Sequence, residues 1–159
     1  MTKYALVVVL SAFAGVGCKG QEEPTPAGEA PAGRVRILDA PATGDVRGAV
    51  RQTLSQAAGG KRRVVVYVGA TWCEPCQRFH KSAAAGELDA TFPDLTLLEF
   101  DLDRDRERLS AAGYTSKYIP LFALPAPDGS ASGKQVEGGI KGEGAVAYMA
   151  PRLKALLGQ

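Results

Sequence analysis

The sequence contains little histidine and cysteine, and its charges nearly cancel. A single histidine among 159 residues excludes any site that requires two imidazoles, such as the two-histidine helix of zinc metalloproteases. Three cysteines are too few for the disulfide framework of a small secreted protein. The 19 basic and 17 acidic residues leave a formal charge of +2, without the strong basic excess of a nucleic-acid-binding domain. We therefore expect no nucleic-acid partner.

Aromatic residues are also scarce, at 7% of the chain, but 45% of the residues are hydrophobic and 23% are charged. This balance excludes an intrinsically disordered or fibrous protein. The length leaves room for one folded domain rather than two. No region is set apart as a dimerisation domain, so we expect a monomer.

The first residues have the layout of a secretory signal. Lys3 provides a positive start, residues 5–14 are mostly apolar, and small residues precede Cys18. This arrangement resembles a bacterial lipobox, although Gly15 stands where that motif prefers leucine. We expect residues 1–17 to be a signal peptide and Cys18 to be lipidated. The alternative is an ordinary cleaved signal followed by an incidental cysteine.

The segment after Cys18 predicts a tether. Residues 19–33 contain Pro, Gly, Ala and Glu but no large apolar side chain, so they cannot bury enough surface to fold. We expect residues 18–33 to link a lipid anchor to a domain at 34–159. The protein would then face the periplasm of a bacterium. Lys19, the residue after Cys18, does not resemble the inner-membrane retention signal of bacterial lipoproteins. This difference favours the outer membrane.

Hydrophobic periodicity predicts nine elements in the domain. They are strand 35–38, helix 46–57, strand 64–68, helix 77–88, strand 95–100, helix 103–113, strands 121–124 and 135–137, and helix 146–157. The continuous apolar run at 64–68 is typical of a strand covered on both faces. The order βαβαβαββα predicts an α/β fold, a central mixed sheet flanked by helices.

Three sequence features add detail to the predicted helices. Asp103 is a favourable N-cap, and the alternating charges of residues 103–108 predict a solvated helix face. Pro151 predicts a kink or a split in the last helix.

The chemistry-bearing motif is Trp72-Cys73-Glu74-Pro75-Cys76, at the junction of a strand and a helix. Unpaired N–H groups and the macrodipole at a helix N-terminus favour a thiolate over a thiol. Cys73 is therefore the expected nucleophile. Cys76, separated from Cys73 by two residues, is placed to resolve the mixed disulfide. Pro75 rigidifies the first turn without a lost hydrogen bond.

Other uses of this cysteine pair remain open. A zinc site could combine Cys73, Cys76 and His80, but a structural zinc requires four ligands and the only other thiol is Cys18. A copper carrier could use the same three residues, although a second imidazole is absent. An inert disulfide is also possible in an exported protein. We expect no resident metal.

The motif WCEPC after a buried strand, followed by Ile119-Pro120 before another strand, resembles the thioredoxin superfamily. The stretch VVVYVGATWCEPCQRFHKSA is similar to the reductase domains of periplasmic disulfide-interchange proteins. The resemblance covers residues 34–158 and implies a three-layer sandwich. It implies that Pro120 is cis and lies against the disulfide, leaving the preceding backbone free to pair with a substrate. It also implies that Trp72 shields the thiols, the alternative being a core aromatic.

The sequence departs from the family at one position. Thioredoxins carry a buried aspartate five residues before the tryptophan, where it assists proton transfer, and here that residue is Tyr67. Glu99 on the neighbouring predicted strand could replace it, or could be an exposed strand-end carboxylate. His80 lies one turn after Cys76 and could tune that sulfur, or could face solvent.

These observations predict an exported, membrane-tethered thiol–disulfide oxidoreductase that reduces protein disulfides. The thiols carry the electrons, so no cofactor is expected, and a separate redox partner must recharge the pair. Alternatives are a metal-handling protein that uses the same thiols and a thioredoxin-fold binding module.

Overall fold

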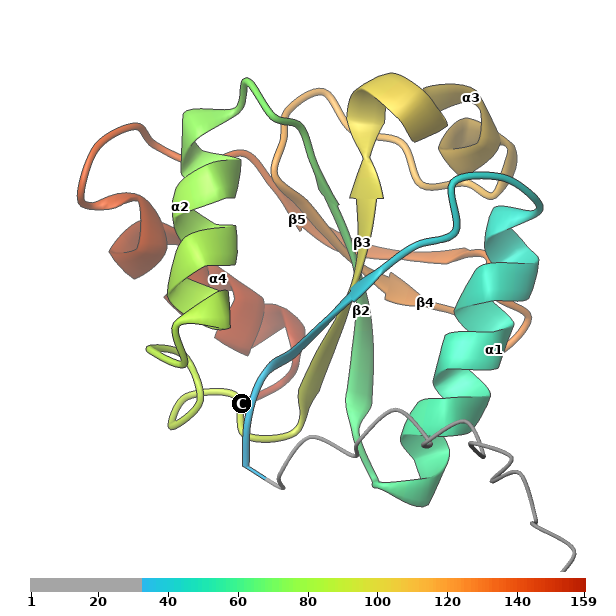
Figure 1. Ribbon diagram of the computed structural model, residues 1–159, viewed down its shortest axis with the longest axis horizontal. Coiled ribbons are helices and arrows are strands. Elements are labelled where there is room, and N and C mark those ends of the chain that lie inside the picture. Colours follow the sequence, from blue (N-terminus) through green and yellow to red (C-terminus); the bar gives the residue numbers. More distant parts are fainter. Residues whose placement is uncertain (1–32) are drawn as a thin grey trace, which may run out of the picture.

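The computed structural model describes residues 33–159, and Figure 1 shows them as a twisted sheet with helices on both faces. The elements are β1 (Arg36–Asp39), α1 (Val46–Gly59), β2 (Arg63–Gly69), α2 (Glu74–Ala84), β3 (Leu95–Asp101), α3 (Leu102–Ala111), β4 (Leu121–Pro125), β5 (Ala131–Glu137) and α4 (Ala145–Leu156). Within this range no helix has the length and apolar character needed to cross a membrane. The predicted signal peptide, Cys18 and nearly all of the predicted tether lie outside the described residues.

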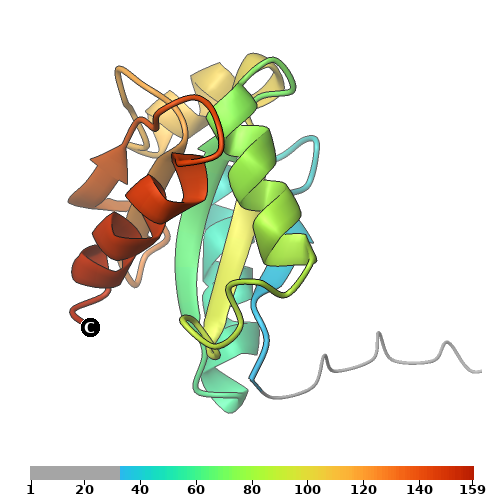
Figure 2. The same cartoon turned by 90° about the vertical axis from the view of Figure 1, so that its left-hand side faces the viewer.

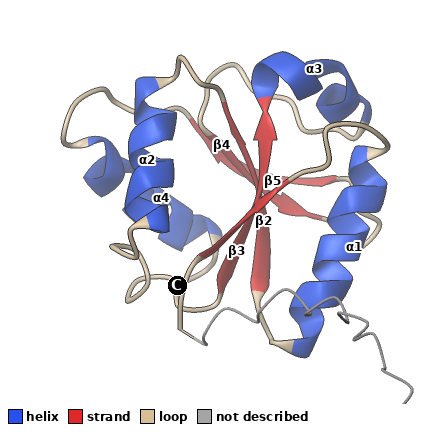
Figure 3. Ribbon diagram, in the orientation of Figure 1, coloured by secondary structure: helices blue, strands red, loops and turns tan. Residues whose placement is uncertain are grey.

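The sheet has the strand order β1-β3-β2-β4-β5. Strands β1, β3 and β2 are parallel, whereas β4 is antiparallel to β2 and β5 is antiparallel to β4. The parallel strands are joined through helices and the last two form a hairpin (Figure 3). This is the predicted α/β architecture, a thioredoxin-like mixed sheet.

The sheet separates two hydrophobic cores. Val66 and Val68 of β2 pack in the core that includes residues of α1 and α3, whereas Val65 and Tyr67 pack in the core that includes residues of α2 and α4. Figure 2 shows α2 and α4 on the near side of the sheet. The alternation follows from the two-residue period of a strand. The three-layer sandwich and the two-sided burial of β2 are thus confirmed.

The start of α2 differs from the prediction. The helix begins at Glu74 rather than at residue 77, because Cys73 is its N-cap and Pro75 fits its first turn. It ends at Ala84 rather than at residue 88. The cysteine pair therefore spans the helix N-terminus itself.

Three other details also differ. Strand β5 begins at Ala131, four residues before its predicted start, and α4 continues through Pro151 without a split. The N-cap of α3 is Asp101 rather than Asp103, since the Asp101 carboxylate accepts hydrogen bonds from the backbone N–H groups of Asp103 and Arg104. Asp103 stands in the first turn of α3, where a carboxylate is still favourable.

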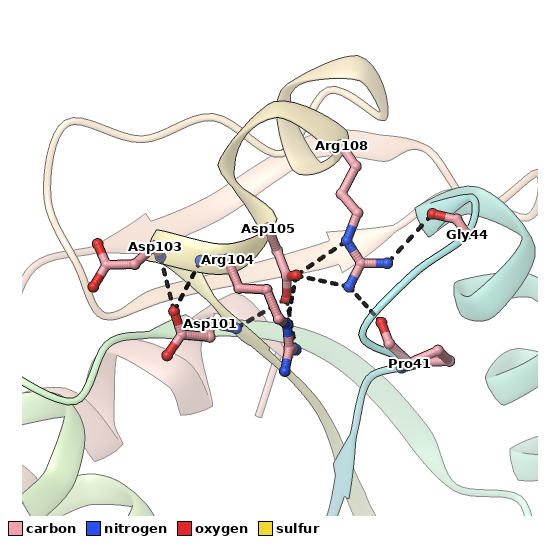
Figure 4. Close-up of polar contacts among 7 residues, drawn as sticks. All are labelled: Pro41, Gly44, Asp101, Asp103, Arg104, Asp105 and Arg108. Atoms are coloured by element: carbon pink, nitrogen blue, oxygen red, sulfur yellow. Dashed lines mark hydrogen bonds and ion pairs between the residues drawn. The ribbon is translucent and has the colours of Figure 1, made fainter.

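The predicted solvated face of α3 is wrong at Asp105, whose side chain is fully buried (Figure 4). Its Oδ1 lies 2.8 Å from Arg104 Nε and 2.7 Å from Arg108 Nη2, and its Oδ2 accepts a hydrogen bond from the backbone N–H of Asp101. Desolvation raises the pKa of Asp105, but the hydrogen bonds and charges of the two arginines outweigh it, so the net pKa lies below the ordinary value.

Arg108 extends this cluster to the loop between β1 and α1. Its guanidinium donates to the carbonyl oxygens of Gly44 and Pro41 as well as to Asp105. Sequence periodicity detected the alternating charges but could not show that one of them points inward. The cluster joins α3, the end of β3 and the loop before α1, beside the end of the sheet where the cysteine pair lies.

Candidate redox site

Cys73 and Cys76 form a disulfide with an S–S distance of 2.07 Å. The two residues are 5% and 3% exposed, and they pack with Ala70 beneath Leu102 and Ile119. The Cys73 sulfur also accepts a hydrogen bond from the backbone N–H of Cys76 at 3.3 Å. After reduction this sulfur lies among the unpaired N–H groups of the first turn of α2, which favour its thiolate.

Glu74 contributes less negative charge to the site than its position suggests. Its carboxylate accepts a hydrogen bond from Arg78 Nε at 2.8 Å and another from the backbone N–H of Gly142 at 3.2 Å. The hydrogen bond from Arg78 is the main reason why the pKa of Glu74 lies below its ordinary value. Glu74 is therefore ionised, and the neighbouring guanidinium partly compensates its charge.

Trp72 is not a core aromatic. Its side chain is 64% exposed, and its indole Nε1–H donates to Asp103 Oδ2 at 2.7 Å. This hydrogen bond links the active-site turn to the first turn of α3 and fixes the ring beside Cys73.

The Ile119-Pro120 peptide bond is cis, as the resemblance implies. Ile119 packs against the cysteine pair, while Pro120 is buried and its carbonyl accepts a hydrogen bond from Gly138. Among the hydrogen bonds of residues 33–159, none involves the backbone of Ile119. An extended peptide could pair with these free groups.

Cys73 opens onto a groove of about 470 Å³. Exposed aromatic rings, apolar side chains and three cationic groups line this groove, which does not include Cys76. Its lining is Trp72, Cys73, Glu74, Pro75, Leu102, Arg106, Ser116, Lys117, Tyr118, Ile119, Gly139 and Lys141. A polypeptide bound here would meet the Cys73 side of the disulfide first.

Cys76 borders a different cleft, of about 530 Å³, whose lining also includes His80 and Glu99. The His80 Nδ1 atom lies 2.7 Å from Glu99 Oε2. Burial raises the pKa of Glu99 above its ordinary value, and the charge and hydrogen bond of His80 partly oppose this shift. Glu99 is thus a partly buried, partnered carboxylate and not a bare strand-end group.

Tyr67, which stands where thioredoxins carry aspartate, is buried and donates its hydroxyl proton to the Cys76 carbonyl at 2.9 Å. Desolvation, together with the charge of Glu99, raises its pKa. The phenol is therefore a fixed donor that orients the turn and cannot serve as a base near neutral pH. The departure from the family pattern leaves the acid–base role at Cys76 to another group.

Sequence reasoning named these residues individually but did not predict two of the contacts that the structure shows among them. Nothing local indicates that Trp72 bonds to Asp103 or that His80 pairs with Glu99. The only available signal was the strand register, which places Glu99 beside Tyr67 on the face covered by α2. Among residues 33–159, no group of three or more His, Cys, Asp and Glu side chains is arranged to hold a metal ion.

No protein-family model and no curated protein matches the sequence. Several solved structures of thioredoxins resemble the fold. A poplar thioredoxin h mutant is 23% identical, with 84% of this chain and 91% of that chain covered at a TM-score of 0.49. Arabidopsis thaliana thioredoxin O1 in the oxidised state is 22% identical, with 79% of this chain and 96% of that chain covered at a TM-score of 0.47. A thioredoxin mutant from Halobacterium salinarum is 21% identical, with 81% of this chain and 92% of that chain covered at a TM-score of 0.47.

Proposed function

We propose that this protein is a thiol–disulfide oxidoreductase that reduces disulfide bonds in other proteins. The observation that carries the proposal is the Cys73–Cys76 disulfide at the N-terminus of α2, with Cys73, and not Cys76, in the groove that Trp72 and Ile119 also line. A disulfide that served only as a staple would not need an exposed tryptophan and, at Ile119, a backbone free of hydrogen bonds beside it.

The chemistry follows from this placement. In the reduced protein the Cys73 thiolate attacks one sulfur of a substrate disulfide, and the other substrate sulfur leaves as a thiolate. Cys76 then loses its proton and attacks Cys73, which releases the second substrate thiolate and forms the Cys73–Cys76 bond. Two electrons pass from the protein dithiol to the substrate, whose two thiolates take up protons. A separate dithiol donor must then reduce the pair again.

Reduction of insulin by dithiothreitol, with and without the protein, tests the proposal. We expect the purified reduced protein to accelerate insulin precipitation, and metal analysis of the same sample to give less than one equivalent of copper or zinc. A protein that binds copper stoichiometrically and leaves the insulin reaction unchanged would instead support the metal-handling alternative. A binding module would do neither.

We also propose the direction of electron flow, which is from this protein to its substrate. A strong oxidant stabilises its reduced form as a low-pKa thiolate, and the Glu74 carboxylate next to Cys73 opposes this. We therefore expect a potential nearer to about −270 mV, as in thioredoxin, than to about −120 mV, as in a strong periplasmic oxidant. Equilibration with glutathione measures this value. A potential above about −150 mV on the same scale would make the protein an oxidant.

Glu74→His tests the electrostatic reason for this direction. The variant removes a negative charge beside Cys73, so its potential should shift toward oxidising values. Arg78 and Gly142 already hold the carboxylate, so the shift should be less than about 30 mV. Glu107→His, the same change at an exposed position on α3, is the matched control and should leave the potential unchanged. A shift in the reducing direction would contradict the argument.

Export and lipid anchoring complete the proposal and rest on the sequence alone. If Cys18 carries lipid, Cys18→Ser should move the protein from the membrane fraction to the soluble fraction or leave its signal unprocessed. Fractionation with mass spectrometry of the mature N-terminus measures both results. Full membrane retention of the variant at the mature mass would contradict lipidation.

A further inference from the structure

Cys76 requires a proton acceptor, whereas the Cys73 thiolate is stabilised by the N-terminus of α2. As the resolving group it must lose a proton to attack, yet it is 3% exposed, and Tyr67 stands at the position where thioredoxins carry the aspartate that assists this step. The nearest hydroxyl, on Tyr67, already donates to the Cys76 carbonyl. A group that accepts the proton must therefore reach the sulfur by another route.

The cleft behind Cys76 provides that route. Gly69, at the end of β2, forms part of its wall, and a Cβ atom at this position would lie only 3.7 Å from the Cys76 sulfur. The missing side chain leaves the sulfur beside the cleft. A volume of about 530 Å³ holds several water molecules, each of which occupies about 30 Å³ in the liquid.

His80 and Glu99 line this cleft as a hydrogen-bonded pair. In-register parallel pairing puts Glu99 beside Tyr67, on the sheet face beneath α2, and α2 carries both Cys76 and His80. With Glu99 bonded to Nδ1, the imidazole Nε2 remains available to a water molecule. Other titratable or charged groups at the cleft are Asp39 on β1, Asp101 at the end of β3, Arg104 on α3 and, beside Gly69, Tyr67 on β2.

We infer that the His80–Glu99 pair is the proton acceptor for Cys76, acting through water in this cleft. This inference rests on the proposed function. When Cys76 attacks the mixed disulfide, its thiol proton passes to His80, and the Glu99 carboxylate stabilises the resulting imidazolium. The imidazolium later gives the proton to solvent. In the opposite direction the same pair returns a proton to Cys76 as the Cys73–Cys76 bond breaks.

The two steps can be observed separately with the disulfide reagent 5,5′-dithiobis(2-nitrobenzoate) and the reduced protein. All forms of the protein in this experiment carry Cys18→Ser, so that no third thiol reacts. Attack by Cys73 releases one thionitrobenzoate, and resolution by Cys76 releases the second, so two kinetic phases of absorbance report the two sulfurs. In Glu99→Gln and His80→Asn we expect the second phase at neutral pH to be at least tenfold slower, and the first phase to be unchanged. Glu99→Asp, which keeps a carboxylate, should recover part of the rate.

The pH profile of the second phase distinguishes proton transfer from a structural effect. The wild-type rate should level off once the pair has lost its proton. The rate of Glu99→Gln should instead continue to rise with pH, because the Cys76 thiol must then lose its proton without this acceptor. Glu107→Gln on the exposed face of α3 is the matched control and should behave as wild type.

A second phase that is unaffected by either substitution would overturn the inference, as would an equal slowing of both phases with an unchanged pH profile. Failure of the wild type to reduce insulin, by contrast, would reject the proposed function. A Glu99-dependent second phase would then still assign the proton acceptor. The two conclusions therefore fail in different experiments.

Discussion

Replacing either active-site cysteine is expected to stop turnover, but at different steps. Cys73→Ser should lower the rate of insulin reduction by more than about a thousandfold, because serine lacks a thiolate and Cys76 does not line the substrate groove. Cys76→Ser should also prevent turnover, yet its Cys73 can still attack. This variant should accumulate as a covalent mixed disulfide with the substrate.

Mass spectrometry under non-reducing conditions measures this difference directly. We expect an adduct that dithiothreitol removes in Cys76→Ser and none in Cys73→Ser. Cys18→Ser makes the same chemical change outside residues 33–159 and serves as the matched control, with a wild-type rate of insulin reduction. Adducts on Cys76 in the Cys73→Ser variant, at a comparable rate, would reverse the assigned order of the two sulfurs.

The sequence predicts an order of attack because the features on which that prediction rests are local. Cys73 and Cys76 are three residues apart, and the buried strand and the proline around them indicate a helix N-terminus. The α/β topology was predictable for a similar reason, since apolar periodicity reports each element separately. The structure confirms the order of elements and the mixed sheet.

Contacts between distant segments were less predictable. Pro120 was assigned to the site by family resemblance, because no local pattern brings residue 120 to residue 73. The pairing of His80 with Glu99 depends on the register of β3 and on the rotation of α2, and sequence periodicity fixes neither to within one residue. The inward orientation of Asp105 was likewise not predictable, since its charged sequence neighbours give the whole segment the pattern of a solvated helix face.

Asp105→Ala is expected to destabilise the protein more than any surface substitution on α3. The change leaves Arg104 and Arg108 without their shared carboxylate and removes the acceptor of the Asp101 N–H group. Removing one partner of a buried ion pair costs about 3–5 kcal/mol, and the partial exposure of Arg104 favours the lower end, near 3 kcal/mol. For a domain of this size, that loss corresponds to a decrease in Tm of about 10 °C.

Thermal unfolding at several pH values tests this prediction, with Glu107→Ala as a control that removes one exposed carboxylate from the same helix. Because the pKa of Asp105 is lower in the folded protein, its stabilisation is present above the unfolded pKa, about 3.9, and is lost as the pH falls below it. The Tm difference between wild type and Asp105→Ala should therefore be largest near neutral pH and narrow below about pH 4. A difference that is small at neutral pH, or that widens in acid, would show that the buried carboxylate does not hold α3 against β3 and the loop before α1.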